Sequence, residues 1–169
     1  MEIDYFIDSL QNSAAKIEAM LRDMDLDAVR WKPEPAMWSM LEVINHLFDE
    51  EREDFRVRLD IILHHADKSW PGINPPGWVT ERAYNKKDPQ ISLSGFLAER
   101  QKSLHWLRSL VNPDLGKSYN HPSLGSLTAG DLLAAWAAHD YRHLRQLADL
   151  HARYLNLKAA PFSTRYAGP

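Results

Sequence analysis

The sequence of 169 residues contains no cysteine. This absence excludes disulfide bonds, thiolate zinc sites and a cysteine nucleophile, so any thiol used in catalysis has to come from outside the chain. Long apolar runs are also missing, since no stretch of 18 apolar residues occurs. The N-terminus is acidic and amphipathic, unlike a signal peptide. We therefore expect no membrane span and a cytoplasmic protein.

Clustered positive charge is the next feature that the sequence lacks. The net charge is -3, the pI is near 6.2, and lysine and arginine are scattered along the chain. Binding to nucleic acid requires a basic patch, so we expect no nucleic-acid partner. The apolar content of 44% over this length supports one hydrophobic core but not two. Residues 1–169 are therefore predicted to form a single domain.

Helical periodicity dominates what is present. The predicted helices cover residues 2–24, 39–64, 92–111 and 128–154. Ser39 with Glu42, and Thr128 with Asp131, have the spacing of capping boxes at the starts of the second and fourth helices. Prolines and glycines mark residues 66–89 as a long connection, and no segment alternates as a strand does. These features predict an all-α fold, a four-helix bundle with long crossover loops.

Two histidines lie four residues apart in the predicted fourth helix. His139 and His143 share a stripe with the apolar Trp136 and Leu147, so both are expected to point into the bundle. A buried imidazole must satisfy both ring nitrogens, and one cation could serve two neighbouring rings. Ordinary polar or capping roles are the alternative for such a pair. Trp136, one turn before His139, is the expected wall of a pocket.

The predicted second helix supplies a third histidine and a carboxylate. His46 shares a stripe with Val43 and Leu47, so it faces inward and could complete a three-histidine site. Glu50 follows one turn later and could orient a histidine, accept a proton or bind the metal. The other acidic residues of this segment are interpreted as a solvated charge run. They are Asp49, Glu51, Glu53 and Asp54.

Three other classes of site fit the spacing less well. The HDYRH motif is similar to a zinc-protease motif, but Asp140 replaces the glutamate and no glycine turns the chain after His143. A di-iron bundle requires glutamates that the fourth helix lacks. A hemerythrin-like carrier needs more inward histidines than the stripes provide, because His105 falls on a flank. Tyr141 and Arg142 leave the metal face and are expected to contact solvent or another subunit.

Two separated motifs together resemble the DinB-like (DinB/YfiT-like) superfamily of four-helix bundles. They are WKPEPAMWSMLEVINHLFDEE and HPSLGSLTAGDLLAAWAAHDYRHLRQL. In that superfamily a tryptophan–serine motif leads to a helix with one histidine, and a late helix carries a histidine pair. The resemblance places the family's metal triad at His46, His139 and His143. It also implies similarity to metal-dependent thiol transferases and isomerases rather than to DNA polymerases.

The function expected from these features is a metal-dependent transferase that joins a small-molecule substrate to an external low-molecular-weight thiol. A metal-dependent hydrolase and a non-catalytic metal-binding stress or interaction protein are the alternatives. Three neutral histidines leave coordination positions open on a divalent ion, and Glu50 is the candidate catalytic residue. Zinc or nickel is favoured, with iron and manganese as alternatives. The resemblance and the exposed apolar side chains of the first helix, such as Tyr5, suggest a homodimer.

Overall fold

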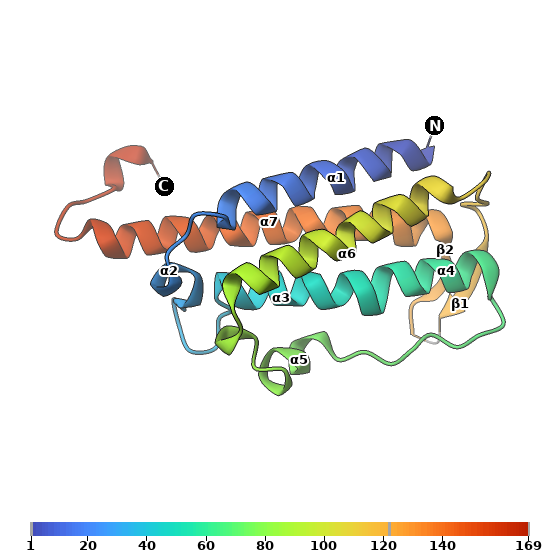
Figure 1. Ribbon diagram of the computed structural model, residues 1–169, viewed down its shortest axis with the longest axis horizontal. Helices are drawn as coiled ribbons and strands as arrows, with labels where there is room; N and C mark the ends of the chain where they lie inside the picture. The colour runs from blue at the N-terminus through green and yellow to red at the C-terminus, as the bar shows by residue number, and fades with distance from the viewer. Residues whose placement is uncertain (1, 122, 169) are drawn as a thin grey trace.

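A computed structural model of the chain describes residues 2–121 and 123–168 and shows a four-helix bundle (Figure 1). Its long helices are α1 (Glu2–Leu21), α3 (Met40–Glu50) with its continuations η1 (Glu51–Phe55) and α4 (Arg56–His64), α6 (Pro89–Ser109) and α7 (Ala129–Ala159). Short helical segments are α2 (Leu26–Arg30), α5 (Pro75–Glu81), η2 (Tyr84–Lys86) and η3 (Arg165–Ala167). The predicted fold class is confirmed. None of the described helices combines the length and apolarity needed to span a membrane.

The four apolar stripes meet along the axis of the bundle. α1 packs between α6 and α7, and α3 also contacts both of these helices. Leu10, Ile17, Phe96, Leu104 and Leu147, which come from α1, α6 and α7, are completely shielded from solvent. Leu10 and Ile17 are seven residues apart and Phe96 and Leu104 are eight apart, spacings close to two helical turns that keep each pair on one buried face. This packing fixes α3 beside α7, where the predicted histidines lie.

Capping boxes fix the starts of both helices that carry these histidines. The Glu42 amide donates to Ser39 Oγ at 3.1 Å, and the Ser39 amide donates back to Glu42 Oε2 at 2.8 Å. Thr128 and Asp131 make the equivalent reciprocal bonds at the start of α7. Each box satisfies amides that a helix N-terminus leaves free, an effect of about 1 kcal/mol. Both predicted boxes are confirmed.

The long connection predicted at 66–89 contains α5 and η2 and is fastened to the bundle by polar contacts. Asp49, on α3, accepts hydrogen bonds from the Tyr84 hydroxyl and from Arg82. Arg82 also pairs with Glu53 at 2.8 Å. The Asp49 side chain is 1% exposed, so the prediction that it is solvated is wrong. The connection supplies the donors that compensate this buried carboxylate.

A small β-hairpin precedes α7 at the end of the bundle that holds the N-terminus (Figure 1). Its antiparallel strands are β1 (Ser118–His121) and β2 (Gly125–Thr128). The prediction that no strand competes is therefore wrong. The strands are only four residues long and contain no buried residue, so each is too short for its sequence to reveal a half-buried strand. Gly125, with φ of 75°, takes a left-handed conformation that glycine adopts readily.

Candidate metal centre

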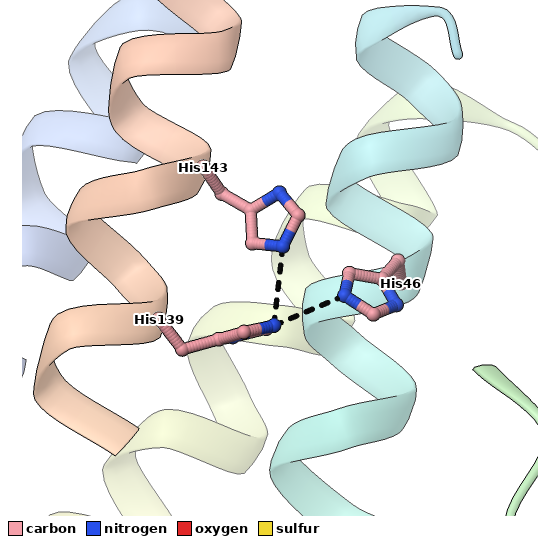
Figure 2. A group of neighbouring side chains, drawn as sticks. All are labelled: His46, His139 and His143. Atoms are coloured by element: carbon pink, nitrogen blue, oxygen red, sulfur yellow. Dashed lines mark hydrogen bonds between the residues drawn. The ribbon is translucent and has the colours of Figure 1, made fainter. Parts of the chain in front are cut away.

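The structure brings the three predicted histidines together between α3 and α7 (Figure 2). His139 Nε2 lies 3.2 Å from His46 Nε2 and 3.1 Å from His143 Nε2. The ligand nitrogens all lie within 4.8 Å of one another. We call these three residues the histidine cluster. It is the group of potential metal ligands that the described residues assemble in this way, and Glu50 is not part of it.

Hydrogen bonds among the three rings cannot satisfy all three Nε2 atoms. An imidazole nitrogen carries either one hydrogen or one lone pair, so His139 Nε2 cannot bond fully to both of its neighbours. A divalent cation accepts a lone pair from each nitrogen at the same time. The donor set and its convergence therefore fit a metal ion better than they fit a hydrogen-bonded core.

Aromatic rings enclose the histidine cluster on two sides. The ring of Trp38 lies 4.9 Å from that of His46 and stacks parallel to that of His143, with 6.4 Å between centroids. The ring of Phe55 lies 5.1 Å from that of His139. His46 is buried, whereas the other two histidines are half-buried. The site is therefore shielded from bulk water on the α3 side and more accessible on the α7 side.

Burial keeps the histidines neutral, which is the form that binds a metal. Burial, with the neighbouring rings, lowers the pKa of His46 to about 2. Burial also lowers the pKa of His139 to about 3, assisted by His143 and by the positive charges of Arg100 and Arg142. The pKa of His143 is lowered for the same main reason. At neutral pH all three rings can therefore offer lone pairs.

A hydrogen bond selects the tautomer of His143. Its Nδ1 lies 2.8 Å from Gln146 Oε1, and because an amide oxygen only accepts, Nδ1 carries the hydrogen. The Nε2 lone pair is then directed at the other rings. His46 Nδ1 is buried and has no hydrogen-bond partner among the described residues. Gln146 therefore orients His143 by a hydrogen bond, whereas packing alone orients His46.

A small cavity lies against the more accessible side of the cluster. Phe55, Ala135, Ala138, His139 and Arg142 line it, and its volume is about 210 Å³. The alanines leave room beside His139 that larger side chains would fill. Arg142 is exposed to solvent, as predicted, and its side chain also lines this cavity beside His139. Trp136, the predicted wall, is not among these residues.

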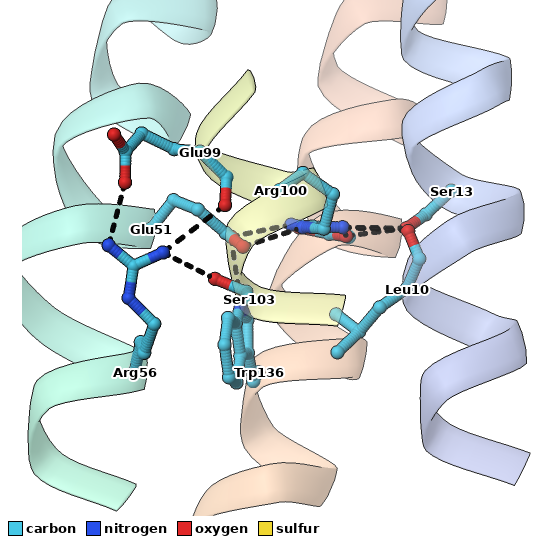
Figure 3. A network of polar contacts seen from close by, with 9 residues as sticks. Leu10, Ser13, Glu51, Arg56, Glu99, Arg100, Ser103 and Trp136 are labelled. Carbon is cyan, nitrogen blue, oxygen red and sulfur yellow. Dashed lines mark hydrogen bonds and ion pairs between the residues drawn. The ribbon is translucent and has the colours of Figure 1, made fainter. Parts of the chain in front are cut away.

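Trp136 belongs to a second polar cluster in the next layer of the bundle (Figure 3). Its Nε1 donates to Glu51 Oε2 at 3.0 Å. Arg100 donates two hydrogen bonds of 2.8 Å to the Glu51 carboxylate and bonds of 2.6 and 3.0 Å to Asp140. The side chains of Arg100, Glu51 and Asp140 are each 1% exposed. We call these four residues the Arg100 network, and the predicted solvation of Glu51 is wrong.

A turn of π-helix begins at Glu51 and changes the phase of the helix beyond it. Residues Glu51–Phe55 form η1, in which hydrogen bonds reach one residue further than in an α-helix. The extra residue shifts the phase of the helix after Glu51, so Phe55 reaches the core. Glu51 itself lies four residues after Leu47 on the buried stripe of α3, and its amide still bonds to Leu47 O as in an α-helix. A signal for its partner was present, because Arg100 lies four residues from both Phe96 and Leu104 on the buried stripe of α6.

Glu50, the candidate catalytic residue, lies on α3 one turn after His46 and is 5% exposed. Its Oε1 has no hydrogen-bond partner among the described residues. Burial and the negative charge of Asp54 raise the pKa of Glu50 to about 8. Asp54 is also buried and pairs with Arg58 at 2.7 Å, so its predicted solvation is wrong. Glu50 therefore exchanges its proton near neutral pH.

The fold and the site together place this protein among four-helix bundles that carry three convergent histidines between the second and the last long helix. Comparison with known families identifies the family. A profile of the DinB superfamily matches residues 9–147, which is most of the chain. The chain therefore belongs to the DinB superfamily, as the resemblance of its two motifs predicted.

Relatives in this superfamily are distant but span nearly the whole chain. A protein of Oceanobacillus iheyensis, named as a candidate metal-dependent hydrolase, is 22% identical over 89% of this chain and 87% of its own length. A Bacillus cereus protein with the same description is 20% identical over 89% and 86% of the two chains. The structure of YfiT from Bacillus subtilis, described as a candidate metal-dependent hydrolase with an unusual four-helix bundle topology, superposes with a TM-score of 0.79. It is 19% identical and covers 90% of this chain and 87% of YfiT, so it shows the shared fold.

Proposed function

We propose that this protein is a divalent-metal-dependent hydrolase that acts on a small molecule. The observation that carries the proposal is the convergence of three neutral imidazole nitrogens beside a cavity. A closed structural site uses four protein ligands, whereas three ligands beside open space are typical of a catalytic site. The descriptions of the relatives as candidate metal-dependent hydrolases support the same reaction class.

His46, His139 and His143 are the proposed ligands, each through Nε2. Bound there, a divalent cation would supply Lewis acidity and an acidified water for hydrolysis at neutral pH. Trp38 and Phe55 exclude water from the sides of the cluster, and Gln146 holds the ring of His143 in its binding tautomer. Zinc and nickel remain the favoured ions because imidazole suits both.

We propose Glu50 as the residue that exchanges a proton during turnover. A general acid or base works best when its pKa lies near the working pH, and the pKa of Glu50 is about 8. Its position outside the group of convergent ligand atoms fits this role better than that of a ligand. In its protonated form the carboxyl group can donate a proton to a leaving group. In its ionised form it can take a proton back.

Thiol transfer is now the less supported reading of the same site. It came from the family resemblance, and no feature among the described residues identifies a thiol-binding position. The relatives described above are associated with hydrolysis. Because three histidines could also present a thiolate to an electrophile, the test of hydrolysis has to include an added thiol.

The test uses untagged protein loaded with zinc or nickel and a panel of 4-nitrophenyl esters, anilides and phosphate esters. We expect release of 4-nitrophenol or 4-nitroaniline that a chelator abolishes. His46→Ala, His139→Ala and His143→Ala should each lose metal and at least about 100-fold in rate. His105→Ala, at an exposed position on α6, is the matched control and should retain both. Fully loaded protein without hydrolysis contradicts the proposal, and turnover that requires an external thiol supports the transferase instead.

A further inference from the structure

Arg142 and Arg145 place two positive charges on the accessible side of the histidine cluster. Both side chains are exposed on α7, and neither has a hydrogen bond or ion pair within residues 2–121 and 123–168. Arg142 lines the cavity beside His139. It also lines an adjacent hollow of about 470 Å³ together with Arg145, Gln146 and Asp149. The Arg142 side chain therefore borders both the cavity and the adjacent hollow.

Acidic residues near these arginines are already paired with other cations. Asp149 pairs with Arg153 at 2.8 Å, one turn further along α7. Asp140 is buried on the other side of α7 and pairs with Arg100 at 2.6 Å. The positive charge of Arg142 is therefore not neutralised by the protein. A guanidinium has five donors in a planar fork that matches a carboxylate, so an anionic ligand would satisfy it.

The shape of the cavity limits the rest of that ligand. Its volume of about 210 Å³ is below the range of about 300–1,000 Å³ that is typical of larger ligands. Phe55 and the methyl groups of Ala135 and Ala138 make part of its wall apolar. A short apolar chain with a charged group at one end fits both features. A phosphate dianion, by contrast, is usually bound by several cations or by a nest of amides.

We propose that the substrate of this site is a small carboxylate-bearing molecule whose carboxylate pairs with Arg142. Its short apolar part lies between Phe55 and Ala138, and its reactive bond lies at the histidine cluster. This inference rests on the proposed function, because it identifies the substrate class of the same site. Arg145 adds positive charge to the approach along α7 and is expected to contribute less than Arg142.

Binding can be measured without metal, which removes direct coordination of the carboxylate by the ion. Butanoate, its neutral isostere butanamide, and inorganic phosphate are titrated into metal-free protein, followed by NMR shifts of arginine Nε–H groups and of His139. We expect saturable binding of butanoate that Arg142→Gln weakens about tenfold, the loss expected for one charge-assisted hydrogen bond near solvent. Arg22→Gln, which removes the same charge from a distant exposed position, should bind butanoate as the parent does.

A second arm measures the charge preference of turnover. The substrates are 4-nitrophenyl hydrogen succinate, which carries a carboxylate, and its methyl ester, which does not. Arg142→Gln should lower kcat/KM for the charged ester, through KM, by about tenfold more than it lowers kcat/KM for the neutral ester. An equal loss for both esters, with metal content reduced, would make Arg142 a structural residue and overturn the inference.

The two proposals fail in different ways. If butanoate binding depends on Arg142 but no ester is hydrolysed, the hydrolase proposal fails and the anion site stands. If Arg142→Gln binds butanoate as well as the parent, the inference is overturned whether or not esters are hydrolysed. Tighter binding of phosphate than of butanoate, lost in Arg142→Gln, would also overturn it, because the site would then select phosphate.

Discussion

Two polar clusters lie side by side in this bundle, and they are built in opposite ways. His139 and Asp140 are consecutive residues of α7, yet one points into the histidine cluster and the other into the Arg100 network. In the network, Arg100 donates to two carboxylates and to a backbone carbonyl, that of Leu10. In the histidine cluster, three nitrogens face one another with too few hydrogens to pair with their lone pairs.

The balance of hydrogen-bond donors and acceptors distinguishes a structural cluster from a ligand site. Buried polar groups that satisfy one another hold helices together and need nothing more. Buried polar groups with a surplus of one kind require a partner from outside the chain. The Arg100 network joins η1, α6 and α7, and Arg100 also bonds to the Leu10 carbonyl on α1, whereas the histidine cluster leaves lone pairs for an ion. Each of the following predictions would break or sharpen this distinction.

Removal of the arginine should have the largest effect. Arg100→Met leaves Glu51 and Asp140 buried without a counter-charge, which is expected to cost about 3–5 kcal/mol of unfolding free energy. In metal-free protein, His139→Asn should cost about 1 kcal/mol, because the nitrogen it removes has no full partner. Urea unfolding monitored by tryptophan fluorescence measures both values.

The control for that experiment is Arg22→Met, which removes an arginine from an exposed i,i+4 pair with Glu18. It should change the unfolding free energy by less than about 0.5 kcal/mol. If His139→Asn instead destabilises the metal-free protein as strongly as Arg100→Met does, the histidines form a structural core. The distinction between the two clusters would then be lost.

Metal should stabilise the protein through the histidine cluster alone. An ion that binds only the folded chain, at a free concentration of 100 times its Kd, adds about 2.7 kcal/mol to the unfolding free energy. We expect this as a rise of several degrees in Tm with zinc or nickel, reversed by a chelator. His46→Ala, His139→Ala and His143→Ala should each abolish the rise. Asp140→Asn should keep it, because the network does not contribute a ligand.

The fold and the three histidines could be predicted because they follow a regular helical period. His46, His139 and His143 lie on apolar stripes with intact 3.6-residue spacing, so a helical wheel places them inside. Ser39 and Thr128 identify their helix starts by local chemistry alone. Wherever the geometry of a single helix sufficed, the prediction agreed with the structure.

The polar surroundings of the site could not be predicted in the same way. Glu51 belongs to a run of acidic residues, which predicts a solvated side chain, whereas its burial depends on Arg100 and Trp136 from two other helices. The burial of Asp49 depends on Tyr84 and Arg82 from a connection distant in sequence. Arg142 reaches a cavity that exists only when α7 packs beside η1. These features depend on tertiary packing and not on local periodicity.

The pH dependence of stability should report Glu50. Folding raises its pKa from 4.5 to about 8, so the folded state binds the proton more tightly than the unfolded state between these values. This contribution to stability is complete below pH 4.5 and is lost as pH rises towards 8. Glu50→Gln should therefore gain on the parent as pH rises from 5 to 8, by up to about 1.4 kcal/mol for each pH unit. Parallel urea-unfolding profiles for metal-free parent and variant would contradict the assignment.

The smallest effect should come from Gln146, which supports a ligand without touching the other rings. Its Oε1 accepts the Nδ1 hydrogen of His143, so Gln146→Met frees that ring to change tautomer and to rotate. Zinc should bind about tenfold more weakly, equivalent to about 1.4 kcal/mol, while the stability of the metal-free protein changes by less than about 1 kcal/mol. Gln146→Glu, which keeps an acceptor oxygen at that distance, should restore affinity. Competition with a metal-sensitive dye measures both variants. Equal zinc affinity in parent and Gln146→Met would mean that packing against Trp38 alone orients His143.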